Sequence, residues 1–363
     1  MTAPATVRLV QVVPRLAPPA EGVGSYAEAL AGALARLAVE TCFVVGDPAW
    51  PGGEGGGGAA AVRVEARTAA ALAAALDQAG EGAPVLLHYA GYGYQSRGCP
   101  RWLVAGLARR RLITLFHEVY ASGPPWRSSF WTLPIQRRLA AALVRRSDAL
   151  ITTLTLYARL LRPWAAGREI AIQPVFSTVG EPESSVVRPL AARRRRLVVF
   201  GGAGVRSRTW TEARPALARA CADLGIEEIA DVGAAVAGPA GVPAEVGGVP
   251  VHRLGVLAAA AVSDLLLDSL AGFAVYPPAF LPKSTIFAAY CAHGVLPVCV
   301  HWRAAVDRGA AADGLAAGRQ YWQADGRSAG GPAHPQEIAD AARLWYAGHS
   351  LARQAAAWRE RLG

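Results

Sequence analysis

Short apolar runs alternate along the chain with longer runs in which alanine, leucine and arginine recur at helical spacing. In the first half we expect strands over 7–13, 41–46, 62–66, 84–91, 112–120, 148–154 and 169–175. The helices expected between them lie over 25–38, 68–79, 100–111, 130–146 and 156–165. Apolar strands that alternate with helices predict a parallel sheet covered on both faces. The predicted fold class is therefore α/β.

The alternation stops over 177–196, a polar stretch with two prolines that we interpret as a linker. It then restarts, with strands expected over 197–204, 227–233, 251–256, 272–278 and 295–300 and helices over 210–224, near 260–270 and after Lys283. This restart predicts two Rossmann-like doubly wound domains, 1–180 and 181–340, that face a cleft. Residues 341–363 are expected to be helical and can cross back to the first domain.

The composition gives no membrane signal, because the hydrophobic content of 53% owes much to alanine. No uncharged segment reaches the roughly 18–20 residues that a membrane helix needs. The first residues run into a strand pattern without the basic and apolar regions of a signal peptide. We therefore expect a cytoplasmic protein. The seven histidines lack metal-ligand spacing, so we expect no bound metal. We expect no resident cofactor either.

The net charge of +10 is unevenly distributed. Residues 97–168 contain 13 arginines and only two acids, Glu118 and Asp148. Such an excess attracts anionic membranes, nucleic acid or acidic substrates, but it also occurs on solvated arginine-rich helices. Among macromolecular partners we expect a peripheral contact with an anionic membrane rather than nucleic acid.

A glycine-rich loop, "PRLAPPAEGVGS", follows the first strand. Ser25 and Glu28 form a capping box, so we expect the helix to begin at Ser25. Gly22 and Gly24 just before it permit close backbone approach, and the N–H groups of a helix N-terminus suit an anion. A plain glycine turn explains this pattern equally well.

The second half opens in the same way, with "VFGGAGVRSRTW". Gly202 lies in the glycine run, and Arg206 and Arg208 follow it as candidate counter-charges for a phosphate. The alternative is a glycine turn followed by surface arginines.

Lys283 is the one lysine among 37 basic residues. It follows an apolar strand and precedes an apolar helical run whose expected N-cap is Ser284. A cation at a helix N-terminus opposes the helix dipole, so this position suits a bound phosphate better than a purely structural role. Thr285 can add a hydroxyl group to such a site.

Polar and aromatic residues also stand at strand exits in the first half. His117 and Glu118 lie where a histidine can contact a sugar hydroxyl or move a proton. Tyr92 and Tyr94 follow another strand, and Trp126 lies in an aromatic, basic loop that could stack on a sugar, grip an acceptor or touch a membrane interface. Structural packing is the alternative role for each of them.

Together these features resemble the GT-B glycosyltransferases, and "FAAYCAHGVLPVCV" is similar to a segment near the donor site of their retaining, family-4-like members. The resemblance covers most of the chain through short motifs. It implies an N-terminal acceptor-binding domain, a C-terminal domain that holds a nucleotide-diphospho-sugar, and metal-independent transfer with retention. The acceptor would be a glycan, a lipid-linked molecule or a small molecule.

The resemblance also implies roles for individual residues. The implied donor-binding residues are Gly22, Gly24, Gly202, Arg206, Arg208, Lys283, Ser284 and Thr285. His117, facing the transferred sugar, and Glu118 are the catalytic candidates. Tyr92, Tyr94 and Trp126 are the acceptor-binding candidates.

The family's E-x7-E acidic pair is absent: Ala289 occupies its second position, and the first falls near Leu281. The alternative is therefore a catalytically inactive protein of the same shape that binds a nucleotide or a glycan. A Rossmann-type oxidoreductase is a third reading, supported by Asp47 after the second strand and opposed by the missing G-x-G-x-x-G motif.

Overall fold

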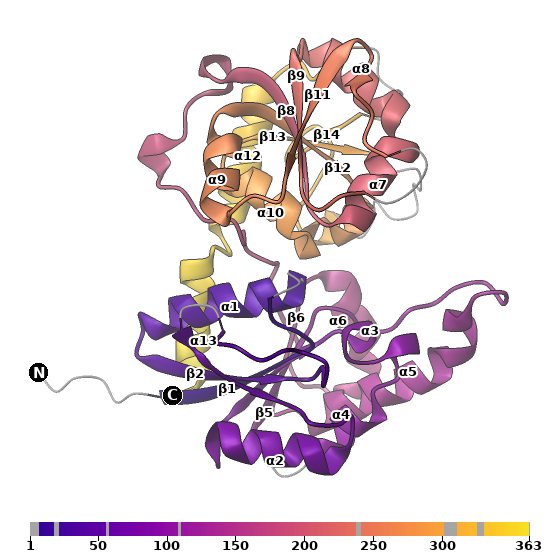
Figure 1. Cartoon of the computed structure of the whole chain (residues 1–363), viewed down its shortest axis with the longest axis vertical. Helices are drawn as coiled ribbons and strands as arrows, with labels where there is room; N and C mark the ends of the chain where they lie inside the picture. Colours follow the sequence, from indigo (N-terminus) through magenta and orange to yellow (C-terminus); the bar gives the residue numbers. More distant parts are fainter. Residues whose placement is uncertain are drawn as a thin grey trace, which may run out of the picture. The chain divides into compact units, whose positions relative to one another are not determined.

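The computed structural model describes residues 7–17, 22–55, 58–107, 110–236, 241–300, 311–324 and 330–362. The chain forms two compact units: unit 1 is Met1–Pro174 with Leu351–Gly363, and unit 2 is Val175–Ser350. Within these described residues, each unit contains one seven-stranded sheet flanked by helices (Figure 1). The predicted α/β class with two doubly wound halves is confirmed.

The sheet of unit 1 has the order β3-β2-β1-β4-β5-β6-β7, with parallel pairing throughout. Its strands are β1 (Val7–Val13), β2 (Val39–Val45), β3 (Ala60–Arg63), β4 (Val85–Tyr89), β5 (Leu112–Phe116), β6 (Ala149–Thr152) and β7 (Ala171–Ile172). Its α-helices are α1 (Gly22–Ala35), α2 (Ala69–Gly80), α3 (Gly91–Tyr94), α4 (Arg101–Gly106), α5 (Ser128–Arg146), α6 (Thr155–Leu161) and α13 (Leu351–Leu362). Strands β4 and β5 are buried along their whole length, as a sheet covered on both faces requires.

The sheet of unit 2 has the order β10-β11-β9-β8-β12-β13-β14, in which only the β10–β11 pair is antiparallel among the described pairings. Its strands are β8 (Arg194–Phe200), β9 (Glu228–Val232), β10 (Glu245–Val246), β11 (Val249–Gly255), β12 (Ser269–Val275), β13 (Leu296–Val300) and β14 (Trp322–Gln323). Its α-helices include α7 (Ala203–Thr211), α8 (Arg214–Leu224), α9 (Ala259–Leu267), α10 (Thr285–Ala292) and α12 (Pro335–Ala347). A 3₁₀ helix, η6 (Pro278–Lys283), precedes α10.

Two predicted helix boundaries are wrong. Helix α1 begins at Gly22, so Ser25 lies inside its first turn instead of capping it. In unit 2 a helix was expected over 210–224, but α7 already begins directly after Gly202. Helices α7 and α8 are separate because Pro215, in the first turn of α8, has no N–H for a continuous helical ladder.

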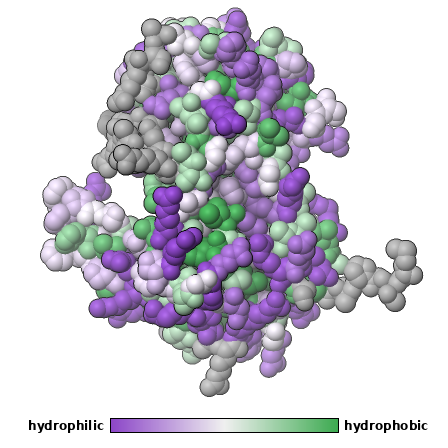
Figure 2. Space-filling view, turned by 180° about the vertical axis from the view of Figure 1, so that it is seen from behind, coloured by the Kyte–Doolittle hydropathy of each residue, from purple (hydrophilic) through white to green (hydrophobic). Residues whose placement is uncertain are grey.

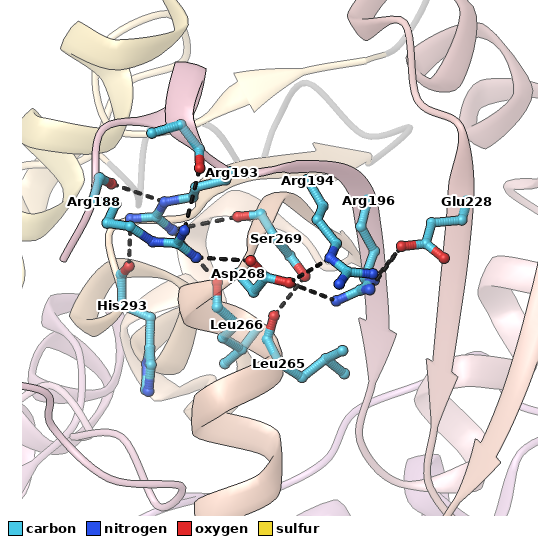
Figure 3. A network of polar contacts seen from close by, with 11 residues as sticks. Arg188, Arg193, Arg194, Arg196, Glu228, Leu265, Leu266, Asp268, Ser269 and His293 are labelled. Atoms are coloured by element: carbon cyan, nitrogen blue, oxygen red, sulfur yellow. Dashed lines mark hydrogen bonds and ion pairs between the residues drawn. The ribbon is translucent and has the colours of Figure 1, made fainter. Parts of the chain in front are cut away.

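The arginine run at the end of the predicted linker belongs to the fold of unit 2, because Arg194 and Arg196 lie in β8 (Figure 3). Arg193 is buried and donates hydrogen bonds to the carbonyl oxygens of Arg188, Leu266, Ser269 and His293, which include the ends of α9 and α10. A cation is favourable there, because helix C-termini carry partial negative charge. Burial lowers the pKa of Arg193 to about 10, so the side chain stays charged at neutral pH.

Asp268 pairs with two arginines of this run, Arg194 and Arg196, and with Arg188 just before it. It lies 2.7 Å from Arg188, 2.9 Å from Arg194 and 3.6 Å from Arg196, and Arg196 also pairs with Glu228 at 2.7 Å. Figure 3 shows Asp268 between Arg188 on one side and Arg194 and Arg196 on the other. The arginine run thus joins β8 to its neighbours.

Candidate functional site

Each sheet has a switch point, at which successive strands are added on opposite sides of the first strand. This point lies between β1 and β4 in unit 1 and between β8 and β12 in unit 2. Loops that follow two such strands diverge and leave a crevice at the carboxyl edge, where ligands of doubly wound sheets bind. The residues at these two edges are therefore the candidates for function.

The carboxyl edge of unit 1 contains a buried row of polar side chains that crosses three strands. Gln11 lies in β1, His88 lies in β4, and His117 follows β5 directly. His88 Nε2 is 2.8 Å from Gln11 Oε1, and His88 Nδ1 is 3.0 Å from His117 Nε2. Gln11 and His88 are fully buried, and His117 is 8% exposed. We call this row the imidazole relay.

The hydrogen bonds of the relay determine where the proton of each ring lies. An amide oxygen only accepts, so His88 carries its proton on Nε2 and accepts at Nδ1 from the Nε2–H of His117. Burial, reinforced by the neighbouring His117, holds the pKa of His88 well below its ordinary value of 6.5, so His88 is neutral at neutral pH. The lone pair of neutral His117 is therefore on Nδ1, the atom that can accept a hydrogen bond or a proton from a hydroxyl.

An aromatic ring from α1 packs against the relay. The ring centroid of Tyr26 is 5.9 Å from that of His88 and 5.1 Å from that of His117, both in edge geometry. The Tyr26 hydroxyl donates to Gln354 Oε1 at 2.8 Å, and Gln354 Nε2 donates to Pro174 O at 2.6 Å. Because Gln354 lies in α13, the last helix of the chain helps to position the relay.

Sequence reasoning did not identify Gln11, His88, Tyr26 or Gln354 as site residues. The available signal was a histidine inside the otherwise apolar strand "VLLHY". A buried histidine is costly unless it is hydrogen-bonded, and the distance of 77 positions between Gln11 and His88 concealed the partner.

The other predicted residues of unit 1 occupy different environments. Glu118 is half-buried beside His117, and the backbone N–H groups of both residues donate to Tyr89 O. Tyr94 is a correction: it is 1% exposed and its hydroxyl donates to the carbonyl oxygens of Val12 and His88, so it supports the sheet and cannot contact an acceptor.

Tyr92 and Trp126 are both exposed, at 43% and 83%. Gln136 of α5 lies 3.2 Å from the Tyr92 hydroxyl and accepts from the N–H of Ala121, so Tyr92 lies at the base of the loop that carries Trp126. Trp126 lies further along this loop, just before α5.

Gly22 and Gly24, at the start of α1, differ in whether the fold needs glycine at that position. A β-carbon at Gly24 would overlap the carbonyl oxygen of Arg15, so glycine is needed there for α1 to pack on the turn after β1. Within the part of the chain that the structure describes, no atom lies within 4 Å of a β-carbon built at Gly22. Packing thus explains why position 24 is glycine, whereas it places no such demand on position 22.

In unit 2 the loop after β8 packs against the first turn of α10 at the carboxyl edge. Gly201 follows β8 with a φ of +125°, and a β-carbon there would lie 2.5 Å from Cδ1 of Ile286 in α10. The next residue, Gly202, is the N-cap of α7, and no atom of the described residues lies within 4 Å of a β-carbon built at it. The loop therefore packs tightly on α10 and leaves open space at the start of α7.

The start of α10 contains the polar trio of the sequence. Ser284 is the N-cap, and its Oγ accepts from the N–H of Phe287 at 3.2 Å, which confirms the predicted cap. Lys283 is half-buried, with Nζ 5.8 Å from the ring centroid of Phe280. Thr285 is the first helical residue and is half-buried. A cation and a helix N-terminus thus lie beside the glycine loop.

Arg206 requires a correction. It is 1% exposed, its Nε and Nη2 atoms donate to Asp231 at 2.9 and 2.5 Å, and its Nη1 donates to Ala234 O at 2.6 Å. A guanidinium held in this way joins α7 to β9 and cannot bind a diphosphate at the surface. Arg208 is exposed on the same helix.

Three further positions bear on the two alternative functions, a catalytically inactive binding protein and an oxidoreductase. Leu281 and Ala289, at or near the positions of the absent acidic pair, are both buried. Asp47, the acid that kept an oxidoreductase open, is buried and pairs with Arg15 at 2.7 Å and with Arg67 at 3.2 Å. Its carboxylate thus has structural partners.

Among the residues that the structure describes, no group of three or more His, Cys, Asp or Glu side chains could hold a metal ion. Within the same ranges, no helix is both long and apolar enough to cross a membrane.

Neither a protein-family model nor the sequence of a curated protein matches the chain. Solved structures match it over nearly its full length. Trehalose-6-phosphate synthase OtsA is 11% identical with a TM-score of 0.60, covering 98% of both chains. An α-glucosyltransferase solved with UDP and a 13-mer DNA is 10% identical with a TM-score of 0.57, covering 99% of both chains.

These likenesses define the class of the fold: the chain has the GT-B fold of glycosyltransferases, as the sequence resemblance indicated. A Listeria monocytogenes protein assigned as a UDP-N-acetylglucosamine 2-epimerase is also similar, at 12% identity and a TM-score of 0.54, covering 98% of this chain and 97% of that one. The fold is therefore shared by proteins with different chemistries, and the residues at the two carboxyl edges must carry the functional argument.

Proposed function

We propose that this protein is a metal-independent glycosyltransferase that moves a sugar from a nucleotide-diphospho-sugar to a glycan, a lipid-linked molecule or a small molecule, with retention. Unit 2 would bind the nucleoside diphosphate and unit 1 the acceptor. The GT-B fold supports sugar transfer in general terms. The observation that carries the proposal is the contact between Gly201 and Ile286, which brings a glycine loop and the Lys283 helix start together.

The carboxyl edge of unit 2 offers a diphosphate the groups that it needs. The starts of α7 and α10 provide backbone N–H groups that have no partner within their helices, and open space lies in front of Gly202. Lys283 contributes the positive charge that Arg206, bound to Asp231, cannot contribute. In this proposal Arg208 has an auxiliary role, because its exposure on α7 leaves it able to approach the ligand.

In unit 1, His117 would hydrogen-bond a hydroxyl of the transferred sugar through Nδ1. The imidazole relay supports this role because it holds the His117 proton on Nε2. His88 and Gln11 would then be positioning residues, which act on the sugar only through His117. Glu118 is kept as a catalytic candidate, and Tyr92 as a candidate acceptor contact.

One observation favours a second candidate, a protein of this fold that binds a nucleotide or glycan without turnover. The positions at or near the absent acidic pair are occupied by the buried apolar residues Leu281 and Ala289, so they supply no carboxylate to a sugar or ribose. The two candidates share the diphosphate site and differ in whether a sugar is released.

Calorimetric titration with UDP, GDP, ADP, dTDP and NAD tests the shared site first. We expect one nucleoside diphosphate to bind, and Lys283→Ala to weaken that binding tenfold or more, because a charge-assisted contact contributes about 1.5–3 kcal/mol. Lys283→Arg should retain most of the affinity. Arg219→Ala, which removes an exposed charge elsewhere in unit 2, should leave it unchanged.

Unchanged affinity in Lys283→Ala would contradict the diphosphate site. If the site is correct, incubation with the matching nucleotide sugars then separates the two candidates. Release of the nucleoside diphosphate that depends on an acceptor supports transfer. Binding without release under every donor and acceptor pairing supports the non-catalytic protein, and conversion of the sugar without an acceptor would indicate an epimerase-type reaction instead.

A further inference from the structure

The segment that leads into helix α5 exposes aromatic side chains that the fold does not cover. Trp126 is 83% exposed, Trp131 is 71% exposed and Phe130 is 41% exposed. Large exposed aromatic clusters on a folded protein mark interaction sites more often than chance decoration. Figure 1 shows the magenta segment before α5 extending away from the sheet of unit 1, and Figure 2 shows it from behind as a projection at the left.

Two of the exposed aromatic residues, Phe130 and Trp131, belong to the amphipathic helix α5, and Trp126 lies in the loop just before it. Trp131, Pro134, Arg138 and Arg145 are all exposed and recur at intervals of three, four or seven positions, which places them along one outward stripe of α5. The exposed N-cap, Arg127, precedes Trp131 by four positions. The opposite stripe contains Leu139, Ala140, Leu143 and Val144 and is buried in unit 1. The outward face therefore combines one tryptophan with arginines instead of being uniformly polar.

The aromatic cluster is ordered by local contacts. The indole N–H of Trp131 donates to Pro125 O at 2.9 Å, and the Phe130 and Trp131 rings meet edge to face at 5.3 Å. Gln136 fixes the base of the loop by accepting from the N–H of Ala121. A preorganised cluster loses little side-chain entropy when it meets a partner.

The charge of this surface selects the partner. The sequence has no acidic residue from 119 to 147, while Arg127, Arg137, Arg138 and Arg145 are exposed there. Tryptophan and phenylalanine favour the boundary between head groups and acyl chains, and arginine pairs with lipid phosphates beside it. We propose that the outward face of α5, with the loop that carries Trp126, docks unit 1 on an anionic phospholipid bilayer.

The projecting shape favours a bilayer over a nucleic acid. Single-stranded nucleic acid is bound in basic grooves lined by stacking residues, whereas a flat lipid surface receives a projecting aromatic tip with cations behind it. The surface does not depend on the transfer reaction proposed above. It would also place unit 1 where a lipid-linked acceptor is found, and it gives Trp126 a role other than stacking on a sugar.

Co-sedimentation of the full chain with vesicles tests the proposal. We expect binding to vesicles of about 70% phosphatidylcholine and about 30% phosphatidylglycerol, and much weaker binding to pure phosphatidylcholine. Binding to the anionic vesicles should decrease clearly between about 50 and about 300 mM NaCl, because added salt screens the attraction between the arginines and the lipid phosphates. Trp126→Ser/Trp131→Ser and Arg127→Gln/Arg138→Gln should each weaken binding about tenfold or more. The fold of each variant is checked by circular dichroism.

Two matched controls lie in unit 2, where Leu344 is 78% exposed and Arg214 and Arg219 are exposed on α8. Leu344→Ser and Arg214→Gln/Arg219→Gln remove the same kinds of group and should bind vesicles like the original chain. Absence of binding to anionic vesicles, or binding unaffected by the tryptophan variants, would overturn the proposal. Binding of a 20-nucleotide DNA that the same variants abolish, without vesicle binding, would identify a nucleic-acid surface instead.

Discussion

The two units share a sheet order and differ in the chemistry at its carboxyl edge. Counted from the first strand of each unit, and with the short strands β10 and β7 set aside, both sheets follow the order 3-2-1-4-5-6. Unit 1 fills the edge beside its switch point with buried side chains, namely Gln11, His88 and His117. Unit 2 leaves that edge to glycine and helix N-termini, with Lys283 as the cation beside them.

This difference shows that the fold sets the location of a site while a few side chains set its chemistry. A buried imidazole row can orient a hydroxyl and respond to protons. An open glycine loop beside two helix starts can hold an anion through backbone groups. The contrast predicts that substitutions that add volume or unpair a charge at its carboxyl edge should destabilise unit 2. At the carboxyl edge of unit 1, the titratable group that acid should affect is His88.

The largest effect is expected from breaking the Arg206–Asp231 pair beneath the glycine loop. Both side chains are almost completely buried, so Arg206→Met leaves an unpaired buried carboxylate and should lower the free energy of unfolding by about 3–5 kcal/mol. Urea denaturation measures this change. Arg208→Met, on the exposed side of the same helix, should change it by less than about 0.5 kcal/mol.

A double variant shows whether Arg206 acts through Asp231. Arg206→Met/Asp231→Leu removes both charges and should recover most of the lost stability, because the main cost is the unpaired charge. An Arg206→Met variant as stable as the original chain, with strongly reduced nucleotide affinity, would instead restore Arg206 as a direct ligand.

The sequence predicted most strands of both sheets because most are short apolar runs between helical segments. It missed the two-residue strands β10 and β14, which are too short to leave a pattern. It also predicted the Ser284 cap, since capping depends on residues within one helical turn. The same alternation of strands and helices predicted which loops lie at the carboxyl edges of the sheets. These features are local, and local pattern is sufficient to reveal them.

The features that sequence did not reveal depend on residues far apart in the chain. Arg206 looked like a phosphate ligand because its partner Asp231 lies 25 positions away on another strand. Tyr26 meets Gln354 across 328 positions, and Tyr94 looked like a pocket residue although its hydroxyl is used within the sheet. Pairing of this kind is set by tertiary packing, which a single sequence pattern does not encode.

The glycine loop of unit 2 should respond differently at two adjacent positions. Gly201→Ala introduces a side chain at a φ of +125° and against Ile286, so it should destabilise the chain by about 1–3 kcal/mol. Gly202→Ala has an ordinary φ of −62° and open space, so its stability cost should stay below about 1 kcal/mol.

The variant that costs little stability, Gly202→Ala, should still weaken nucleotide binding. The methyl group of Gly202→Ala enters the space where the diphosphate is proposed to lie, so calorimetry should show weaker binding in a well-folded variant. If Gly202→Ala binds the nucleotide as tightly as the original chain, the diphosphate does not lie at the start of α7.

The smallest effect concerns the proton balance of the imidazole relay. The pKa of His88 lies well below 6.5 in the folded chain, whereas the unfolded chain titrates near 6.5. Below pH 6.5 the unfolded state therefore binds a proton that the folded state does not. The stabilisation from neutral His88 is fully present above pH 6.5 and decreases as the pH falls, by up to about 1.4 kcal/mol per pH unit.

Unfolding free energies at pH 7.5 and 5.5 measure this contribution as a difference between variants. His293 and His349, whose pKa values burial lowers to about 4, add their own acid sensitivity in unit 2, so the whole chain should lose more than the His88 share. His88→Gln, which keeps a donor for Gln11 and cannot titrate, should reduce the loss by about 1.4 kcal/mol. His334→Gln, at an exposed position, should leave it unchanged. An equal loss in His88→Gln and the original chain would mean that His88 is not held neutral by the fold, and the proton of His117 would then not be fixed on Nε2.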